Sequence, residues 1–347
     1  MRVLVWLKYQ IMLFIPVSVW NKCALVISKP RNRKYLEHKK KFGKLNPDKT
    51  FYLIRRRPPG WGFFSNVLFV CQGIIYAQKN NLVPVVDMEN YWMRELNSVK
   101  KVNGTYNAWC YFFQQTSSFS LEEVYKSKNV ILSAGSEILG SKHWLSTKNI
   151  DPVVTYNNLM FFRSILDNYI KLNESTKCSI EETNKNLNWQ PAETLGVFIR
   201  GKVYEHKIAA TFFNIPELDS LTLEIEKTLQ NYKLNNLFIV TESFQIYENL
   251  RVQFSNYNII PSLRFDKNFN KKAWDIDQRE TWDGGIYMGY EKTLTYLTEM
   301  SLLSNCKHFI GTHSNATIYS LARANLSTGV HKILLDNKIL DINSLVK

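Results

Sequence analysis

The sequence lacks the paired cysteines that would indicate a disulfide framework or a structural zinc site. No two of its five cysteines form a C-x-x-C pair. They are scattered along the chain, at Cys23, Cys71, Cys110, Cys178 and Cys306. An odd number of cysteines without framework spacing favours free thiols and a reducing compartment.

The common nucleotide-binding and metal-binding motifs are missing as well. The glycine-rich stretch GWGFFSN, residues 60–66, is neither a Walker loop nor a G-x-G-x-x-G fingerprint. The nearest approach to a D-x-D pair, which would hold Mg²⁺ through carboxylates, is Asp275 and Asp277. We interpret this pair as part of a solvated loop. The sequence therefore predicts no metal site and no resident cofactor.

A long uninterrupted apolar run is also absent. Residues 3–20 are strongly apolar, but Lys8, Gln10 and Pro16 interrupt them. A membrane span needs ~20 predominantly apolar residues, and a lysine in mid-span costs about 2.5–3.5 kcal/mol. No small-residue cleavage site follows, which argues against a removed signal peptide. A clean transmembrane helix is therefore not favoured.

Basic residues outnumber acids, and they are concentrated at the N-terminus. The formal net charge is +14, and residues 1–50 hold twelve Lys or Arg against only Glu37 and Asp48, so this segment supplies ten of the fourteen charges. A nucleic-acid-binding protein spreads basic residues over its folded face. An apolar segment beside the polybasic run at 29–44 instead predicts contact with a membrane surface. The alternative is a buried helix followed by a solvated loop.

The remaining sequence has the composition of a globular protein. It is 45% hydrophobic and 21% charged over 347 residues, which favours two domains. The pattern predicts a strand at 51–56, a helix at 67–81 and a strand at 82–89, together a βαβ unit. A further strand is expected at 130–134, but the aromatic-rich region around it has no readable topology. Residues 180–193 are polar, and we expect them to bridge the two halves.

The second half alternates strands with helices. Strands are predicted at 194–201, 235–242, 258–263 and 307–312. Helices are predicted at 218–232, 244–254, 293–305 and 314–325. This alternation indicates a parallel sheet with helices on both faces. The predicted fold class is therefore α/β, with two Rossmann-like domains at 51–190 and 191–347 and a membrane-associating segment at 1–50.

Polar residues end three of the apolar strands of the second half. In open α/β sheets, ligands bind beyond the carboxyl ends of the strands. The strand ends carry Arg200, then Thr241 with Glu242, then the turn Thr312, His313, Ser314 and Asn315, with Thr317 in the first turn of the next helix. A helix N-terminus holds phosphate through its unpaired N–H groups, although helix capping explains the same residues. Arg200 could pair with Glu242 or bind a diphosphate, and we favour the diphosphate.

These stretches resemble the GT-B fucosyltransferase superfamily, which includes nodulation, core α-1,6- and protein O-fucosyltransferases. PPGWGFFSNVLFVCQGIIYAQKNNLVPVVDME is similar to the family's Gly-x-Gly helix and following strand. GVFIRG and EMSLLSNCKHFIGTHSNATIYSLA resemble its Arg strand and its last segment. The resemblance covers about residues 52–90 and 194–326. It departs from the family at Phe198, where a His is usual, and at Gly201, where some members have a second Arg.

The resemblance implies a role for each half. The domain at 51–190 would be the acceptor side, with the loop residues Gly60, Trp61, Gly62 and Asn66, and the domain at 191–347 would bind the nucleotide-sugar. Arg200 would hold the donor β-phosphate, and the turn residues Thr312, His313, Ser314, Asn315 and Thr317, together with Thr241, would lie at the donor. Glu299 would contact guanine, the alternative being an exposed helix acid.

The implied reaction is an inverting, metal-independent transfer of a sugar, fucose from GDP-fucose, to a hydroxyl of a glycan or lipid-linked glycan. Glu205 is our first candidate for the general base, followed by Asp283, with His206 as a further possibility. Expected partners are the nucleotide-sugar donor, the acceptor and a membrane surface, but not nucleic acid. We expect the cytoplasmic face of a membrane, or the Golgi lumen in a eukaryote. The alternatives are a transferase with another nucleotide-sugar and a non-catalytic, membrane-tethered binding protein.

Overall fold

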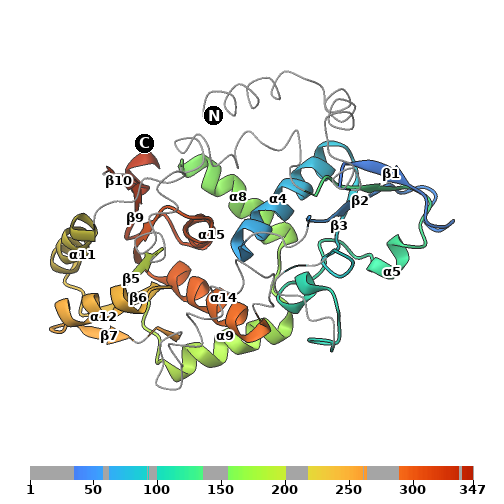
Figure 1. Cartoon of the computed structure of the whole chain (residues 1–347). Coiled ribbons are helices and arrows are strands. Elements are labelled where there is room, and N and C mark those ends of the chain that lie inside the picture. Colours follow the sequence, from blue (N-terminus) through green and yellow to red (C-terminus); the bar gives the residue numbers. More distant parts are fainter. Residues whose placement is uncertain are drawn as a thin grey trace, which may run out of the picture.

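Two sheets lie on opposite sides of the molecule, with helices between them (Figure 1). The computed structural model describes residues 35–57, 62–91, 93, 100–135, 155–200, 218–260, 262–263, 289–335 and 338–346. Within these residues one sheet has four strands and the other six. Most neighbouring strands in both sheets run parallel. The predicted α/β fold with two parallel sheets is thus confirmed.

The first sheet has the strand order β1-β4-β2-β3. Its strands are β1 (His38–Lys40), β2 (Phe51–Ile54), β3 (Val83–Val86) and β4 (Val130–Leu132). All four side chains of β2 are fully buried, as expected for a parallel strand covered on both faces. The chain passes from β2 to β3 on one side and then returns to β4 on the other side of β2. The strand order therefore reverses between β2 and β4.

Residues before position 51 also take part in the first sheet. Strand β1 pairs antiparallel with β4, and the Glu37 carboxylate accepts hydrogen bonds from the hydroxyls of Tyr52 (2.9 Å) and Tyr76 (3.2 Å). The α/β body therefore begins before residue 51, the position at which the apolar pattern predicted its start. Residues 1–34, which carry most of the predicted membrane-associating segment, lie outside the described residues. Among the described residues, no helix has both the length and the apolar character needed to cross a bilayer.

The second sheet has the order β10-β9-β8-β5-β6-β7. Its strands are β5 (Thr194–Ile199), β6 (Asn236–Thr241), β7 (Asn258–Ile260), β8 (His308–Thr312), β9 (Val330–Leu335) and β10 (Lys338–Asp341). Counted from β5 and read from β7, this is the 3-2-1-4-5-6 order of doubly wound folds, with β10 antiparallel. The topological switch point lies between β5 and β8, which pair directly.

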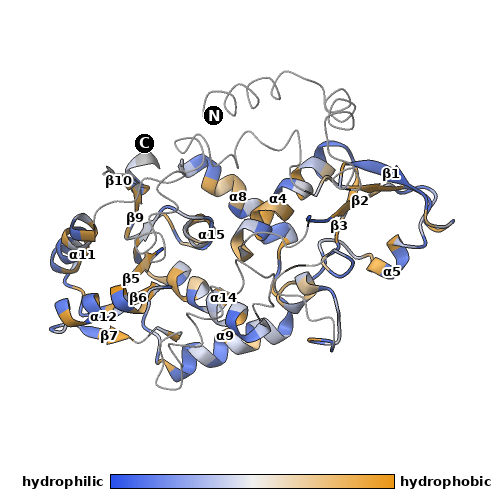
Figure 2. Ribbon diagram, viewed as in Figure 1, coloured by the Kyte–Doolittle hydropathy of each residue, from blue (hydrophilic) through white to orange (hydrophobic). Residues whose placement is uncertain are grey.

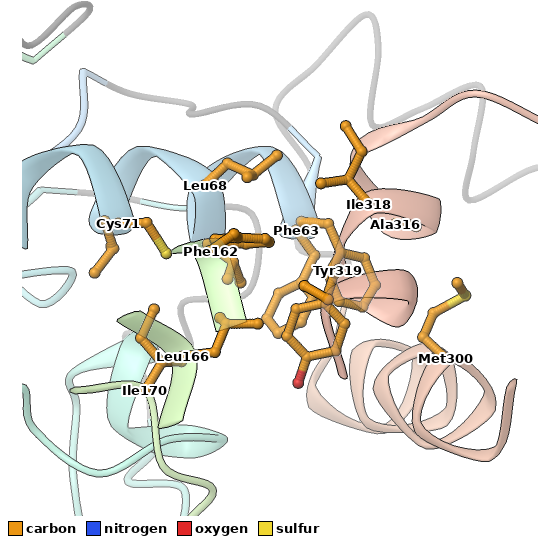
Figure 3. Packing of buried hydrophobic residues seen from close by; sticks show 14 of the residues in the cluster. Phe63, Leu68, Cys71, Phe162, Leu166, Ile170, Met300, Ala316, Ile318 and Tyr319 are labelled. Carbon is orange, nitrogen blue, oxygen red and sulfur yellow. The ribbon is translucent and has the colours of Figure 1, made fainter. Parts of the chain in front are cut away.

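A layer of helices joins the two sheets. Its members are α4 (Phe63–Lys79), α8 (Tyr156–Tyr169), α14 (Tyr290–Asn305) and α15 (Asn315–Arg323). Helix α4 contacts α8 and α15, and α15 contacts α8 and α14. Their buried side chains form one continuous cluster. Figure 3 shows side chains of all four helices meeting in it, and Figure 2 shows the apolar character of α4.

Helix α8 falls in the region whose topology the sequence did not reveal. Leu159, Phe162, Ile165 and Leu166 form its buried stripe. From the same helix, the Arg163 guanidinium donates to the carbonyl oxygens of Ala322 and Ala324 at the end of α15. Helix α8 is therefore bound to the second half by packing and by hydrogen bonds.

Two of the remaining helices follow the predicted pattern, and two others were not predicted. Helices α11 (Leu218–Tyr232) and α12 (Phe244–Gln253) lie where periodicity placed them. The polar segment at 180–193, which we expected to bridge the halves, contains the second half of helix α9 (Glu174–Asn186), and this helix contacts α14. Only Thr176 and Ile180 of α9 are buried, so its apolar stripe was too thin to indicate a helix. The short helix α5 (Leu121–Val124) begins at a capping box formed by Ser120 and Glu123.

Phe64 of α4 also joins the two halves, through contacts with two aromatic rings. Its ring lies 4.9 Å from the ring of Tyr296 in α14 and 4.8 Å from that of Tyr319 in α15, measured between centroids. The side chain is only 3% exposed. Aromatic pairs at these distances add stabilisation beyond the area that they bury.

We expect Phe64→Ala to lower the free energy of unfolding by about 3–5 kcal/mol, because it leaves a cavity at the junction of three helices. Leu223→Ala, on the exposed face of α11 (51% exposed), is the control and should change it by less than about 0.5 kcal/mol. Urea unfolding measures both variants. Similar values for the two would mean that this contact does not hold the halves together.

Candidate functional site

Arg200 follows the last residue of β5, at the carboxyl edge of the second sheet. Side chains alternate along this strand: Val197 and Ile199 face the cluster with α11 and α12, whereas Phe198 faces the helix layer. The face of β5 toward α14 has no room for a side chain at Gly196, because an added Cβ would lie 2.8 Å from Leu303. Because side chains alternate along a strand, we expect the Arg200 side chain on the same side as that of Phe198.

Arg200 is linked to β8 across the topological switch point. Its backbone N–H donates to the Thr312 hydroxyl oxygen at 3.0 Å. Thr312 is the last residue of β8, and the two residues are 112 positions apart in the sequence. The hydrogen bond brings Arg200 beside the turn that leads from β8 into α15. The structure thus brings together two sequence features that we predicted to form one site.

The hydroxyls of this turn bond to one another. The Ser314 hydroxyl oxygen accepts from the Thr317 N–H at 3.1 Å and caps α15. The Thr317 hydroxyl lies 3.0 Å from that of Ser314 and donates to the Thr312 carbonyl at 2.5 Å. Each of these three side chains is at most 6% exposed. These hydroxyls hold the shape of the turn. Gly311 lets the Thr317 side chain pack close to β8, since a Cβ at position 311 would lie 2.8 Å from the Thr317 methyl group.

The N-terminus of α15 is the feature of this turn best suited to bind an anion. In the first turn of a helix the N–H groups lack partners within the helix. Ser314 takes the Thr317 N–H, but within the described residues the Asn315 and Ala316 N–H groups have no acceptor. Together with the positive end of the helix dipole, such groups hold phosphate. Arg200 adds a guanidinium to the same edge of the sheet.

Two more predicted donor residues, Thr241 and His313, lie around this edge. Thr241 ends β6 beside Ile199 of β5, and its hydroxyl oxygen accepts from the Ser243 N–H at 3.2 Å. His313 is buried, and its N–H donates to the Leu334 carbonyl at 3.1 Å, which ties the turn to β9.

Glu299 is fully buried in α14, so the alternative of an exposed helix acid is wrong. One of its carboxylate oxygens accepts from the Ser262 hydroxyl at 2.7 Å. Ser262 lies just beyond the end of β7. A carboxylate is thus held at the carboxyl edge of the second sheet, away from bulk solvent.

The predicted acceptor-side residues are divided between two parts of the chain. Gly60 and Trp61 lie outside the described residues. Gly62 is the N-cap of α4, and Asn66 lies in its first turn, 3% exposed, with its N–H bonded to the Gly62 carbonyl at 3.1 Å. The helix therefore starts four residues before the predicted position. Asn66 lines a small recess with Phe63, Val67, Met88, Ala108 and Trp109.

This end of α4 lies on the same side of the molecule as Arg200. Phe64, in the first turn of α4, contacts Tyr296 of α14, and the Tyr296 ring lies 6.4 Å from that of Phe198, two residues before Arg200. The start of α4 and the end of β5 therefore approach the same part of the helix layer. The remaining candidates, Glu205, His206 and Asp283, and the pair Asp275 and Asp277, lie outside the described residues. Across the described ranges, no three His, Cys, Asp or Glu side chains gather as metal ligands would.

A second arginine at a strand end lies in the first sheet, where we had predicted no site. Arg55 follows β2, and its N–H donates to the Ser133 hydroxyl at 3.0 Å, just after β4. This repeats the Arg200–Thr312 bond of the second sheet, again between the two strands where the order reverses. The signal was present in the sequence, because Arg55, Arg56 and Arg57 end an apolar strand just as Arg200 does.

Comparison with known proteins finds similarity in solved structures only. No protein-family model matches the chain, and no curated protein matches it. The fucosyltransferase NodZ from Bradyrhizobium is 14% identical, with a TM-score of 0.44, over 85% of this chain and 99% of that one. Arabidopsis thaliana FUT1 in complex with GDP is 11% identical, with a TM-score of 0.44, over 82% and 70%. POFUT1 in complex with GDP-fucose is 9% identical, with a TM-score of 0.32, over 80% and 71%.

We expect Thr317→Val to lower the free energy of unfolding by about 1–3 kcal/mol, because it leaves the buried Thr312 carbonyl without its donor. Asn315→Ala, at the half-buried first position of α15, should change it by less than about 0.5 kcal/mol. Chemical unfolding of the two variants measures the difference. An unchanged stability of Thr317→Val would show that its hydroxyl is not needed for the turn.

Proposed function

We propose that this protein is a glycosyltransferase that binds the diphosphate of a nucleotide-sugar at the topological switch point of the second sheet. The observation that carries the proposal is the hydrogen bond from the Arg200 N–H to the Thr312 hydroxyl. It holds a guanidinium-bearing residue beside a helix N-terminus whose first N–H groups have no acceptor in the described residues. Both groups favour phosphate, and both lie where doubly wound sheets bind ligands.

The same two groups suit the chemistry of sugar transfer. An acceptor hydroxyl oxygen attacks C1 of the sugar from the face opposite the nucleotide. The bond between C1 and the β-phosphate oxygen breaks, and the diphosphate leaves with the bonding electrons. Arg200 and the α15 N-terminus stabilise the negative charge that develops on that oxygen. Because these groups supply positive charge themselves, the proposed reaction proceeds without a metal ion.

The proton of the attacking hydroxyl passes to a general base. Glu205 remains our first candidate for this role, followed by Asp283 and His206. All three are proposals from the sequence alone. The inversion at C1 follows from the single displacement, in which the acceptor and the leaving group occupy opposite faces of the sugar.

The donor that we propose is GDP-fucose. The motif resemblance supports it, and so does the position of the Glu299 carboxylate, which the Ser262 hydroxyl holds at the carboxyl edge of the second sheet. A carboxylate can accept from both N1–H and N2–H of guanine. Ser262 holds one oxygen of Glu299, which restricts the orientation of the group. A UDP- or CMP-sugar would have no equivalent pair of donors for this carboxylate.

The proposed acceptor is a hydroxyl of a glycan or a lipid-linked glycan. The apolar and basic character of residues 1–34 supports contact with a membrane surface, where such acceptors are found. We place the protein at the cytoplasmic face of a membrane, or in the Golgi lumen if the source is eukaryotic.

We expect GDP to stabilise the protein against thermal unfolding more than UDP, CMP or ADP does. A ligand at 100 times its Kd adds about 2.7 kcal/mol to the native state. Arg200→Ala should abolish the shift yet still fold, because the bond to Thr312 uses the backbone N–H, which the variant retains. Arg251→Ala is the matched control, since Arg251 is an exposed arginine paired with Glu248 on α12.

Each other outcome changes the assignment. If UDP or CMP stabilises the protein best, the proposal of a glycosyltransferase is kept, but GDP-fucose is rejected as the donor. A normal GDP shift in Arg200→Ala would remove Arg200 from the proposed site. If no nucleotide stabilises the protein, the chain is better explained as a non-catalytic binding protein.

We expect Glu299→Gln to weaken GDP binding by about tenfold to a hundredfold, through the lost pairing with guanine. Glutamine keeps an oxygen to accept from Ser262, so the fold should be retained. Pyrophosphate has no base, and its affinity should be unchanged. Calorimetric titration of both ligands measures the difference. Equal weakening of the two would show that Glu299 supports the site and does not recognise the base.

A further inference from the structure

Three consecutive arginines follow β2. In two of them the charged group has hydrogen-bond partners or is exposed to solvent. The Arg55 guanidinium donates to the Ser133 carbonyl, the Tyr91 hydroxyl and the Leu36 carbonyl. The Arg57 side chain is exposed. Arg56 lies between them, and neither explanation applies to it.

Arg56 is buried without a polar partner. Its side chain is 6% exposed, and its Nε has no hydrogen-bond partner. Throughout the described residues, no ion pair involves it. Its guanidinium carbon lies 4.3 Å from the centre of the Phe69 ring. A cation–π contact of this kind is worth about 0.5–2 kcal/mol, which does not offset the burial of an unpaired charge. Burial lowers the pKa of Arg56 to about 9.

The position of Arg56 is one where open sheets bind ligands. It follows β2 at the carboxyl edge of the first sheet, beside the reversal of strand order between β2 and β4. Within the described residues this edge has the same backbone-to-hydroxyl link, Arg55 to Ser133, that Arg200 and Thr312 form at the proposed donor site. The switch point of a sheet is the expected place for a ligand.

The first turns of α4 face the same space. Phe69, against which Arg56 packs, lies in the second turn of α4. The helix begins at Gly62 without a side-chain cap and has no acid in its first turn. The Arg56 guanidinium thus packs on the N-terminal half of a helix whose first turn has neither an acid nor a side-chain cap to offset its positive end.

We propose that Arg56 binds an oxyanion, a phosphate or a carboxylate, between the carboxyl edge of the first sheet and the start of α4. A planar guanidinium with free donors suits the two oxygens of such a group. The anion would supply the charge that the protein itself does not supply. Its source is either the diphosphate of the donor or an acidic group on the acceptor, and only this choice of source rests on the proposed function.

Arg56→Met tests the proposal, because methionine removes the charge and retains much of the apolar length. Without ligand, we expect the variant to unfold at a higher temperature than the wild type, since an unpaired buried charge is lost. Calorimetric titration with pyrophosphate should show binding at least tenfold weaker. Arg57→Met removes the same charge from the exposed neighbour, and it should change the affinity less than twofold. Arg56→Lys keeps the charge but loses the planar pair of donors, and its affinity for pyrophosphate should lie between those of the wild type and Arg56→Met.

GDP identifies the source of the anion. If Arg56→Met weakens both GDP and pyrophosphate, the anion is the donor diphosphate. If GDP binding is unchanged and the variant loses one of two pyrophosphate sites, the site serves an acidic acceptor. Binding of both probes as in the wild type would overturn the proposal, as would an Arg56→Met variant that fails to fold while Arg56→Lys folds and binds normally. Arg200→Ala keeps the two hypotheses separate: retained GDP binding there refutes the donor site, whatever Arg56→Met does.

Discussion

The hydrogen bond between the Arg200 N–H and the Thr312 hydroxyl is the contact on which the proposed site depends. It connects the ends of β5 and β8, where the strand order of the second sheet reverses. Because the donor is a backbone group, the link holds the turn in place without using the guanidinium. The buried hydroxyls of Ser314 and Thr317 then fix the start of α15. In the proposed site the hydroxyls hold the turn in place, and the N–H groups of α15 and Arg200 are the groups proposed to bind the ligand.

The helix layer determines how the two sheets face each other. Helices α4, α8, α14 and α15 share one apolar cluster, and Phe64 contacts two helices of the opposite half. A packed aromatic junction of this kind resists sliding, because cores are close-packed. Both sheets have an arginine after their first parallel strand, bonded through its N–H to a hydroxyl across the switch point. The sheets therefore present similar edges to the proposed reaction, although only the second has the hydroxyl-rich turn.

Local periodicity predicted most of the helices and strands because their buried residues are strongly apolar. Helix α11 has its predicted bounds, and all residues of β2 and β5 are buried. Helix α9 was not predicted, since only two of its side chains are buried. The strands β1, β9 and β10 were not predicted either. For the site, an arginine at the end of an apolar strand and a helix that starts with Ser-Asn indicated phosphate binding. We predicted no binding site at residues 55–57, although these arginines also end an apolar strand.

The sequence by itself determined the class of the fold, the strands that would be buried and the residue types available at their ends. Hydrophobic periodicity and helix capping are local properties, and a single chain segment is enough to display them. Tertiary structure alone decided which strand ends meet, that Glu299 is buried, and that Arg56 has no partner among the described residues. Strand order and burial depend on contacts between residues far apart in the chain, such as Arg200 and Thr312. No local pattern in either segment specifies those contacts.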